Sequence, residues 1–355
     1  MGAEAYGRWT CPAEAKTSWE KGMQKKILLI HTGGTLAMEG ETHLEPGHYA
    51  SALVEQLPEY VGFAKIDSTI LCNIDSSDIG PAQWTAIARK IADSRAWYDG
   101  FIIVHGTDTM PYTASALAFA FEGLDKPVIL TGAQRPLGAL RNDARRNLAD
   151  SIELATLPIP EVGICFDGVL LRGCRSSKIN TRAYHAFDSP GCEPLAKLGV
   201  DITLGKHIRR PMVPFRCASD FSANVLVIQV TPGMSADVLM RLTERREAET
   251  QSGLDGIVLL PFGVGTVPCL ERPVAPFVRR AVDEGIDVLV ANASTGKIDL
   301  PLYENSQVLL DAGAISGGEM RVEAALVKLM HACATYPDRR ERHEYLRWNV
   351  AGELE

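Results

Sequence analysis

The sequence predicts an α/β fold of two domains, a larger N-terminal one with a mostly parallel sheet flanked by helices and a smaller C-terminal one. Three observations predict it. Short apolar runs rich in β-branched residues recur along the chain, and stretches with helical apolar spacing lie between them. Such alternation is typical of a parallel sheet covered by helices on both faces. The length of 355 residues is enough for two domains.

The elements follow in order along the chain. The apolar runs predict strands at 27–31, 101–104, 128–130, 163–166, 225–230, 257–260 and 288–291. Helical spacing predicts helices at 81–94, 114–122, 141–157, 234–245 and 273–284. Pro81 suits the first turn of the first helix, and Asp78 lies upstream as its predicted cap.

A change in composition near residue 205 predicts where the domains divide. Arg209-Arg210-Pro211, Pro214 and a polar stretch up to Asn224 interrupt the alternation of strands and helices. We therefore expect an N-terminal catalytic domain at 23–205, a linker at 206–224 and a C-terminal domain at 225–355. Residues 1–22 lack the basic and apolar regions of a secretory signal, and we expect this extension to be poorly ordered.

Composition narrows the class of protein. Lys and Arg number 36 against 44 Asp and Glu, a net charge of −8 that argues against a nucleic-acid partner. No run reaches the roughly 18 apolar residues of a membrane helix, so no membrane partner is expected. The eight cysteines have no C-x-x-C spacing and the histidines form no H-E-x-x-H motif. We therefore expect no metal site, and inert thiols in a reducing compartment.

Two threonine-bearing turns follow predicted strands. Thr32-Gly33-Gly34-Thr35 comes after the first, and His105-Gly106-Thr107-Asp108 after the second. Both therefore lie where α/β sheets bind ligands, outside the carboxyl ends of the strands. Glycines permit a sharp turn whose N–H groups can bind an oxyanion, but threonine and aspartate also cap helices, so both interpretations stand for each turn. The first turn has neither the phosphate-loop nor the dinucleotide pattern.

Two further segments carry polar groups suited to a site. Asp75, Ser76 and Ser77 follow the apolar run 70–72 and can clamp a carboxylate and an ammonium group, or simply form a turn with a helix cap. Lys178 closes a stretch rich in basic residues. Four positive charges fall within eleven residues, and their mutual repulsion together with burial would lower the pKa of a lysine base; the alternative is a solvated basic loop. These four are Arg172, Arg175, Lys178 and Arg182.

Taken together, these segments resemble the bacterial-type L-asparaginases, most closely the cytoplasmic type I branch, over about residues 23–350. The resemblance is carried by T-G-G-T at 32–35, D-S-S-D at 75–78, H-G-T-D-T-M at 105–110, L-T-G-A-Q-R-P at 130–136, R-N-D at 141–143, R-G at 172–173 with Lys178, F-D-S-P at 187–190, P-G at 232–233 and G-V-G at 263–265. It implies an asparaginase-like fold and hydrolysis of the side-chain amide of L-asparagine to L-aspartate and ammonia.

The resemblance also implies roles for individual residues. Thr35 would be the nucleophile that forms an acyl-enzyme. A second set beside the scissile amide would comprise Thr107, Asp108 and Lys178. No metal or cofactor is implied.

Substrate binding follows from the same resemblance. The loop of Asp75, Ser76 and Ser77 would hold the α-carboxylate, Asp108 the α-ammonium group, and the backbone of Ala133 the amide. A cytoplasmic homodimer or homotetramer is implied, in which the neighbouring subunit completes the site from a segment near 293–304.

One feature departs from the family pattern. The family carries a tyrosine in the loop after T-G-G-T, thought to assist the nucleophile. Here the loop is shorter, and the position falls on Thr42 or His43, with Tyr49 the nearest tyrosine. The hypothesis is that His43 replaces the tyrosine.

Three other functions fit the sequence. A glutaminase or other small-amide hydrolase is one, because a single methylene changes binding by only about 1–3 kcal/mol. The amidase subunit of a tRNA-dependent amidotransferase is another, but it carries an extra N-terminal domain that residues 1–22 do not supply. The third is a catalytically weak homologue that binds or senses asparagine. The retained threonines and Lys178 argue against it.

Overall fold

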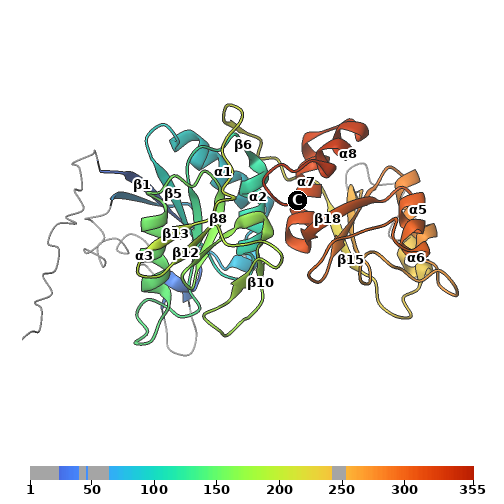
Figure 1. Cartoon of the computed structure of the whole chain (residues 1–355), viewed down its shortest axis with the longest axis horizontal. Helices are drawn as coiled ribbons and strands as arrows, with labels where there is room; N and C mark the ends of the chain where they lie inside the picture. Colours follow the sequence, from blue (N-terminus) through green and yellow to red (C-terminus); the bar gives the residue numbers. More distant parts are fainter. Residues whose placement is uncertain (1–23, 40–44, 47–63, 242–252) are drawn as a thin grey trace, which may run out of the picture.

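Two sheets, each with its own helices, lie side by side in the computed structural model, which describes residues 24–39, 45–46, 64–241 and 253–355 (Figure 1). The larger sheet is built from the N-terminal half of the chain and the smaller from the C-terminal part. The predicted extension 1–22 lies outside the described residues, as do Thr42, His43 and Tyr49.

The N-terminal sheet has eight strands and mixes parallel with antiparallel pairs. In spatial order they are β13 (Ile202–Leu204), β12 (Ala196–Leu198), β9 (Val169–Arg172), β8 (Val162–Phe166), β7 (Val128–Thr131), β5 (Gly100–Val104), β1 (Lys26–His31) and β4 (Lys65–Ile70). The five strands from β8 to β4 are parallel, as predicted. The other three extend the sheet with antiparallel pairs.

A tight turn explains the change of direction. Only Asp167 and Gly168 separate β8 from β9, and both have positive φ angles, 48° and 76°. Two such residues form the turn favoured in β-hairpins, whereas a parallel connection needs a crossover of a dozen residues or more.

Helices cover both faces of this sheet. Alternate residues of β1 divide between two cores: Leu28 packs with α1 (Pro81–Ser94) and α2 (Met110–Ala120), and Leu29 with α3 (Ala144–Leu154). Strand residues therefore face helices on both sides of the sheet, which explains why the strand sequences are unbroken runs of apolar residues.

The structure corrects two local predictions. Gly80, not Asp78, is the N-cap of α1, and its N–H donates to Gln83 Oε1 at 3.1 Å, while Asp78 lies in the short helix η4 (Ser76–Asp78). The helix predicted at 114–122 begins earlier, at Met110, and ends at Ala120. It ends there because the last two residues of the predicted range form the strand β6 (Phe121–Glu122). This strand pairs with β14 (Arg216–Cys217), inside the segment expected to be a linker.

The C-terminal sheet is entirely parallel. Its strands run in chain order as β15 (Val225–Gln229), β16 (Gly256–Leu260), β17 (Asp287–Asn292) and β18 (Ile315–Arg321). One face packs against α5 (Ala275–Asp283) and α6 (Glu304–Asp311), with α4 (Ala236–Met240) beside α5.

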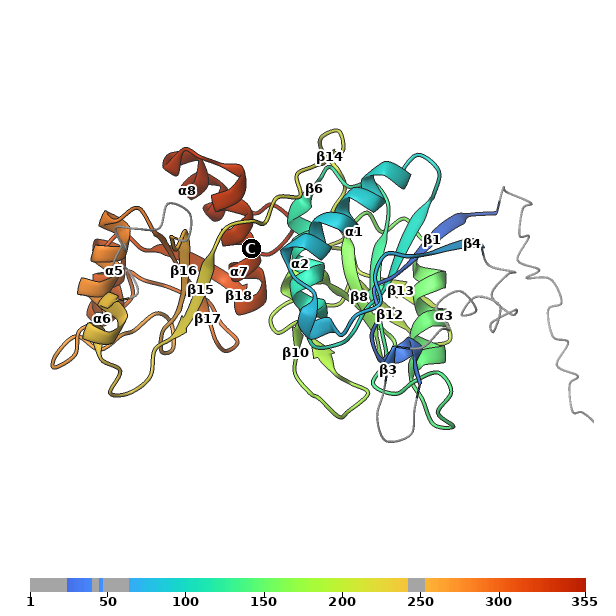
Figure 2. The same cartoon turned by 180° about the vertical axis from the view of Figure 1, so that it is seen from behind.

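The opposite face of this sheet meets the N-terminal half. Helix α7 (Val322–Thr335) lies between the two sheets and packs against α2, and α8 (Arg339–Arg347) lies against α7 (Figure 2). Leu117 of α2 and Leu329 of α7 belong to one buried cluster that also holds Leu289 of β17. The two halves therefore share a hydrophobic core.

Short elements complete the chain around the edge of the larger sheet. They are η1 (Thr35–Ala37), β2 (Met38–Glu39), β3 (Glu45–Pro46), η5 (Gly173–Arg175), β10 (Ser177–Lys178) and β11 (Phe187–Asp188). None of the helices in the described part of the chain is long and apolar enough to span a membrane.

Candidate active site

Three loops meet at the carboxyl edge of β1, β4 and β5, with their backbones in direct contact. Gly33 and Gly34 follow β1 with φ angles of 113° and 94°. A Cβ on Gly33 would lie 2.2 Å from the Ile74 carbonyl oxygen, and one on Gly34 would lie 2.4 Å from the Gly106 nitrogen. A Cβ on Gly106 would lie 2.6 Å from that of Ser76. Only glycine allows both these φ angles and these approaches.

Further contacts tie neighbouring loops to this edge. The Thr109 hydroxyl, at the N-cap of α2, donates to the Ser76 carbonyl at 2.6 Å. Gly132, which follows β7, packs against the loop after β5. A Cβ on Gly132 would lie 2.4 Å from the His105 carbonyl oxygen. Ala133, the next residue, is buried. The segment predicted to meet the amide thus lies beside the threonine-bearing loops.

Lys178 joins two of the predicted residues by hydrogen bonds. Its Nζ donates to Thr107 Oγ1 and to Asp108 Oδ1, both at 2.7 Å. Thr107 is buried, and the Lys178 side chain is 13% exposed, whereas that of Asp108 is 65% exposed. The lysine therefore reaches a hydroxyl at the wall of the site and a carboxylate at its mouth. A lysine beside a hydroxyl can act as its base when neutral.

Two of the basic residues near Lys178 are bonded to other parts of the chain. Arg172 donates two bonds to the Glu161 carboxylate, at 2.6 and 3.0 Å. Arg175 donates to the Glu353 carbonyl at 2.6 Å. Both guanidinium groups thus have partners in other segments of the chain, and the Glu161 carboxylate offsets the charge of Arg172. Repulsion around Lys178 remains a prediction.

Thr35 lies at the same edge. It is the first residue of η1, directly after the two glycines, and it is half-buried. The contact of Gly34 with Gly106 brings its loop against the one that carries Thr107. The structure therefore brings together the loops of the two predicted hydroxyl groups.

The loop after β4 is shaped by its own aspartate. The Asp75 carboxylate accepts hydrogen bonds from the Ser77 N–H at 2.8 Å and from the Ser77 hydroxyl at 2.7 Å. These bonds hold the pKa of Asp75 below its usual value. Ser76 is buried against Gly106, while Asp75 and Ser77 are exposed. The loop thus presents one serine inward and a carboxylate and a serine outward.

A buried histidine supports the Thr107 loop from behind, and the sequence did not reveal this role. His105 Nδ1 lies 2.6 Å from the Gly106 carbonyl and Nε2 lies 2.8 Å from Thr113 Oγ1, which accepts from Trp84 Nε1 at 3.0 Å. A carbonyl only accepts, so Nδ1 carries the proton and Nε2 accepts from the threonine. Burial lowers the pKa of His105 to about 4, which keeps the ring neutral. Its place in the H-G-T-D motif was the available signal.

The described residues hold no group of three or more His, Cys, Asp or Glu side chains arranged for a metal. All seven cysteines in this part of the chain are free thiols. The absence of a cofactor from the reaction remains a prediction.

Hydroxyls next to a lysine and carboxylates at one sheet edge are groups that can hydrolyse an amide. Comparison with known families agrees. Residues 26–210 match the family described as "Asparaginase, N-terminal", and residues 224–346 match "Glutaminase/Asparaginase C-terminal domain". The chain belongs to the asparaginase family.

Individual relatives span nearly the whole chain. It is 35% identical to L-asparaginase 1 of Escherichia coli, covering 94% of this chain and 99% of the relative. It is 32% identical to the L-asparaginase of Thermococcus kodakarensis, covering 93% and 99%. The crystal structure of L-asparaginase I from Vibrio cholerae superposes with a TM-score of 0.83 at 34% identity, covering 94% and 99%. These findings confirm the predicted family and fold.

Proposed function

We propose that this protein hydrolyses the side-chain amide of L-asparagine to L-aspartate and ammonia through an acyl-enzyme on Thr35. The observation that carries the proposal is the pair of 2.7 Å bonds from Lys178 to Thr107 and Asp108, at the edge where the Thr35 loop lies. Family membership and the names of the relatives support asparagine as the substrate.

The first step forms an ester. The Thr35 hydroxyl oxygen attacks the amide carbon of the substrate, and backbone N–H groups near Gly34, Thr35 and Thr107 stabilise the oxyanion. The carbon–nitrogen bond breaks, and the hydroxyl proton passes to the departing nitrogen, which leaves as ammonia. An aspartyl ester of Thr35 remains.

The second step consumes water. Lys178, when neutral, takes a proton through the Thr107 hydroxyl from a water molecule that attacks the ester. The ester bond breaks, aspartate leaves, and the proton returns to Thr35. The short bond between Lys178 and Thr107 supports this relay.

Substrate recognition is assigned to the neighbouring loops. Asp108, two-thirds exposed, receives the α-ammonium group, and the loop of Asp75, Ser76 and Ser77 receives the α-carboxylate through hydroxyl and backbone N–H donors. The backbone of Ala133 meets the amide. The carboxylate of Asp75 contributes by fixing the loop through Ser77.

We further propose a cytoplasmic homodimer or homotetramer, in which the neighbouring subunit closes the site from its 293–304 segment. The division into 23–205, 206–224 and 225–355 is proposed in the same way. The family matches at 26–210 and 224–346 support this division.

Ammonia release from L-asparagine and L-glutamine tests the function. Substrate is varied from micromolar to tens of millimolar, with Thr35→Ala as the control. Selective release from asparagine that disappears in Thr35→Ala is expected. Release mainly from glutamine would identify a glutaminase, and binding of asparagine without release by the folded protein would identify a sensor.

A further inference from the structure

The segment that carries Lys178 is anchored by residues near the C-terminal end of the described chain. Two consecutive residues of η5 bond to this C-terminal segment, defined here as residues 349–355. Cys174 Sγ donates to the Ala351 carbonyl at 3.4 Å, and Arg175 Nη1 donates to the Glu353 carbonyl at 2.6 Å. The Arg175 side chain is only 5% exposed. More than 170 residues of sequence separate the partners.

The C-terminal segment is itself fixed by a buried ion pair. Lys328 Nζ, on α7, lies 2.5 Å from the Glu353 carboxylate, and both side chains are fully buried. The same carboxylate accepts from the backbone N–H groups of Val350 at 3.0 Å and Ala351 at 2.7 Å. Because these bonds close the segment into a tight turn on α7, the Glu353 carbonyl is a fixed acceptor for Arg175.

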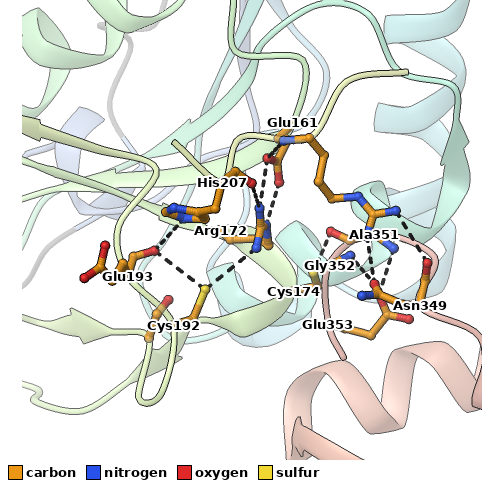
Figure 3. Close-up of polar contacts among 12 residues, drawn as sticks. Glu161, Arg172, Cys174, Cys192, Glu193, His207, Asn349, Ala351, Gly352 and Glu353 are labelled. Carbon is orange, nitrogen blue, oxygen red and sulfur yellow. Dashed lines mark hydrogen bonds and ion pairs between the residues drawn. The ribbon is translucent and has the colours of Figure 1, made fainter. Parts of the chain in front are cut away.

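A glycine brings the C-terminal segment against a second arginine. Gly352 has a φ angle of 92°, and a Cβ there would lie 2.8 Å from Arg172 Nε. Arg172 in turn holds Glu161 by two bonds (Figure 3). The C-terminal segment therefore packs on both ends of the turn 172–175.

Two hydrogen bonds from Ser176 close this turn. The Ser176 hydroxyl donates to the Arg172 carbonyl at 2.7 Å, and the Ser176 N–H to the Gly173 carbonyl at 3.3 Å. Lys178 follows two residues later, in β10. A displacement of Arg175 therefore reaches Lys178 through only two intervening residues, Ser176 and Ser177, and the Ser177 hydroxyl donates to Glu323 at 3.1 Å.

We propose that Arg175, held by the C-terminal segment, is a positioning residue that fixes Lys178 against Thr107 and Asp108. The inference rests on the proposed function only where it predicts an effect on the rate of asparagine hydrolysis. Arg175 touches neither of the two predicted partners of the lysine in the described contacts, so its effect passes through Lys178. A misplacement of about 1 Å in a catalytic group can cost up to about a hundredfold in rate.

The chain offers a matched control. Arg209 also bonds to the C-terminal segment, through Nη1 to Asn349 Oδ1 at 2.8 Å and Nη2 to the Val350 carbonyl at 3.1 Å. It lies outside both the turn 172–175 and β10. Arg175→Ala and Arg209→Ala therefore remove similar bonds to the C-terminal segment, but only Arg175 belongs to the stretch of chain that leads to Lys178.

Steady-state kinetics on asparagine provides the first readout. We expect Arg175→Ala to lower kcat about tenfold with KM changed less than about threefold, and Arg209→Ala to leave kcat within about twofold. In a Lys178→Ala background, Arg175→Ala should cause no further loss, because the coupling vanishes when the positioned group is absent. The inference would be overturned if both arginine variants lost kcat equally. It would also be overturned if Arg175→Ala lowered kcat by the same factor in the presence and in the absence of the Lys178 side chain.

A second readout does not depend on activity. The rate at which an amine-reactive reagent labels Lys178, followed by peptide mass spectrometry, should rise several-fold in Arg175→Ala and stay unchanged in Arg209→Ala. Thermal unfolding identifies any variant that does not fold, and Arg175→Lys then replaces Arg175→Ala. If the protein without substitutions releases no ammonia from asparagine, the proposed function fails. The rate of Lys178 labelling in Arg175→Ala, relative to the protein without substitutions, then still tests the positioning role. Unchanged labelling would refute it.

Discussion

Replacing Gly34 with alanine tests how the sheet edge brings the two threonine loops together. Gly34 combines a φ angle of 94° with a backbone contact to the next loop. A Cβ there would lie 2.4 Å from the Gly106 nitrogen and 2.7 Å from the His105 carbonyl carbon. Both neighbours are backbone atoms, so no side-chain rotation can relieve the clash.

The size of the effect follows from two separate costs. The left-handed conformation costs an alanine about 1–2 kcal/mol. Ordinary contact begins near 3.4 Å, so the loops around Gly34 and Gly106 must separate by about 1 Å. Since Thr107 follows Gly106, that shift moves Thr107 relative to Thr35. We expect a total loss of about 3 kcal/mol in unfolding free energy and about a hundredfold lower kcat.

Gly285→Ala is the matched control for this variant. Gly285 has a φ angle of 84°, and a Cβ there would have no atom within 4 Å. Urea unfolding and ammonia release are measured for both variants. Gly285→Ala should lose only the conformational cost and keep full kcat. If Gly34→Ala loses no more stability than Gly285→Ala and keeps its kcat, the close packing of the loops does not organise the site.

Three further predictions concern charge and pH. Lys178→Met should fold normally but lose at least about a hundredfold in kcat, because it removes the group that holds the proton; a loss below threefold in the ammonia assay would contradict its role. Asp287 is fully buried and pairs with Arg342 at 2.7 Å, so Asp287→Asn should cost about 3 kcal/mol in urea unfolding, and a cost below about 0.5 kcal/mol would show that α8 docks without it. Burial lowers the pKa of His31 and of His105 to about 4, so the folded protein stays neutral at both rings while the unfolded chain takes up protons below about pH 6.5. The contribution of these two rings to the unfolding free energy should therefore be constant above that pH and fall between about 6.5 and 4, by up to about 1.4 kcal/mol per pH unit for each ring, and equal unfolding free energies at pH 7 and pH 5 would be inconsistent with neutral buried histidines.

The strands that build the site were predictable because their signal is local. The apolar runs at 27–31 and 101–104 are buried on both faces in β1 and β5, and such strands carry an unbroken apolar pattern. The turns that follow them contain the glycines whose φ angles and close approaches the structure shows. The family resemblance rests on these same local motifs, which explains why the sequence led to the right fold.

Other elements gave no local signal. Strands β12 and β13 have three residues each and are partly exposed, so neither shows an apolar run. Helix α8 is strongly charged, and its docking depends on Asp287 at the start of β17, more than fifty residues away. The antiparallel edge of the sheet follows from the two-residue turn at Asp167, which is visible only as a short gap between apolar runs.

The sequence by itself determined which residues are candidates for the chemistry, because the motifs place hydroxyls, carboxylates and a lysine at strand ends and in loops. Only the tertiary structure decided which of them touch. Lys178 meets Thr107 across 71 residues of sequence, and Arg175 meets Glu353 across 178. Charge spacing along the chain predicted repulsion around Lys178 but could not show that folding supplies Glu161 and the Glu353 carbonyl as partners for Arg172 and Arg175. Spacing along a chain fixes local geometry, but the partners of a buried charge are set by the segments that the fold packs against it.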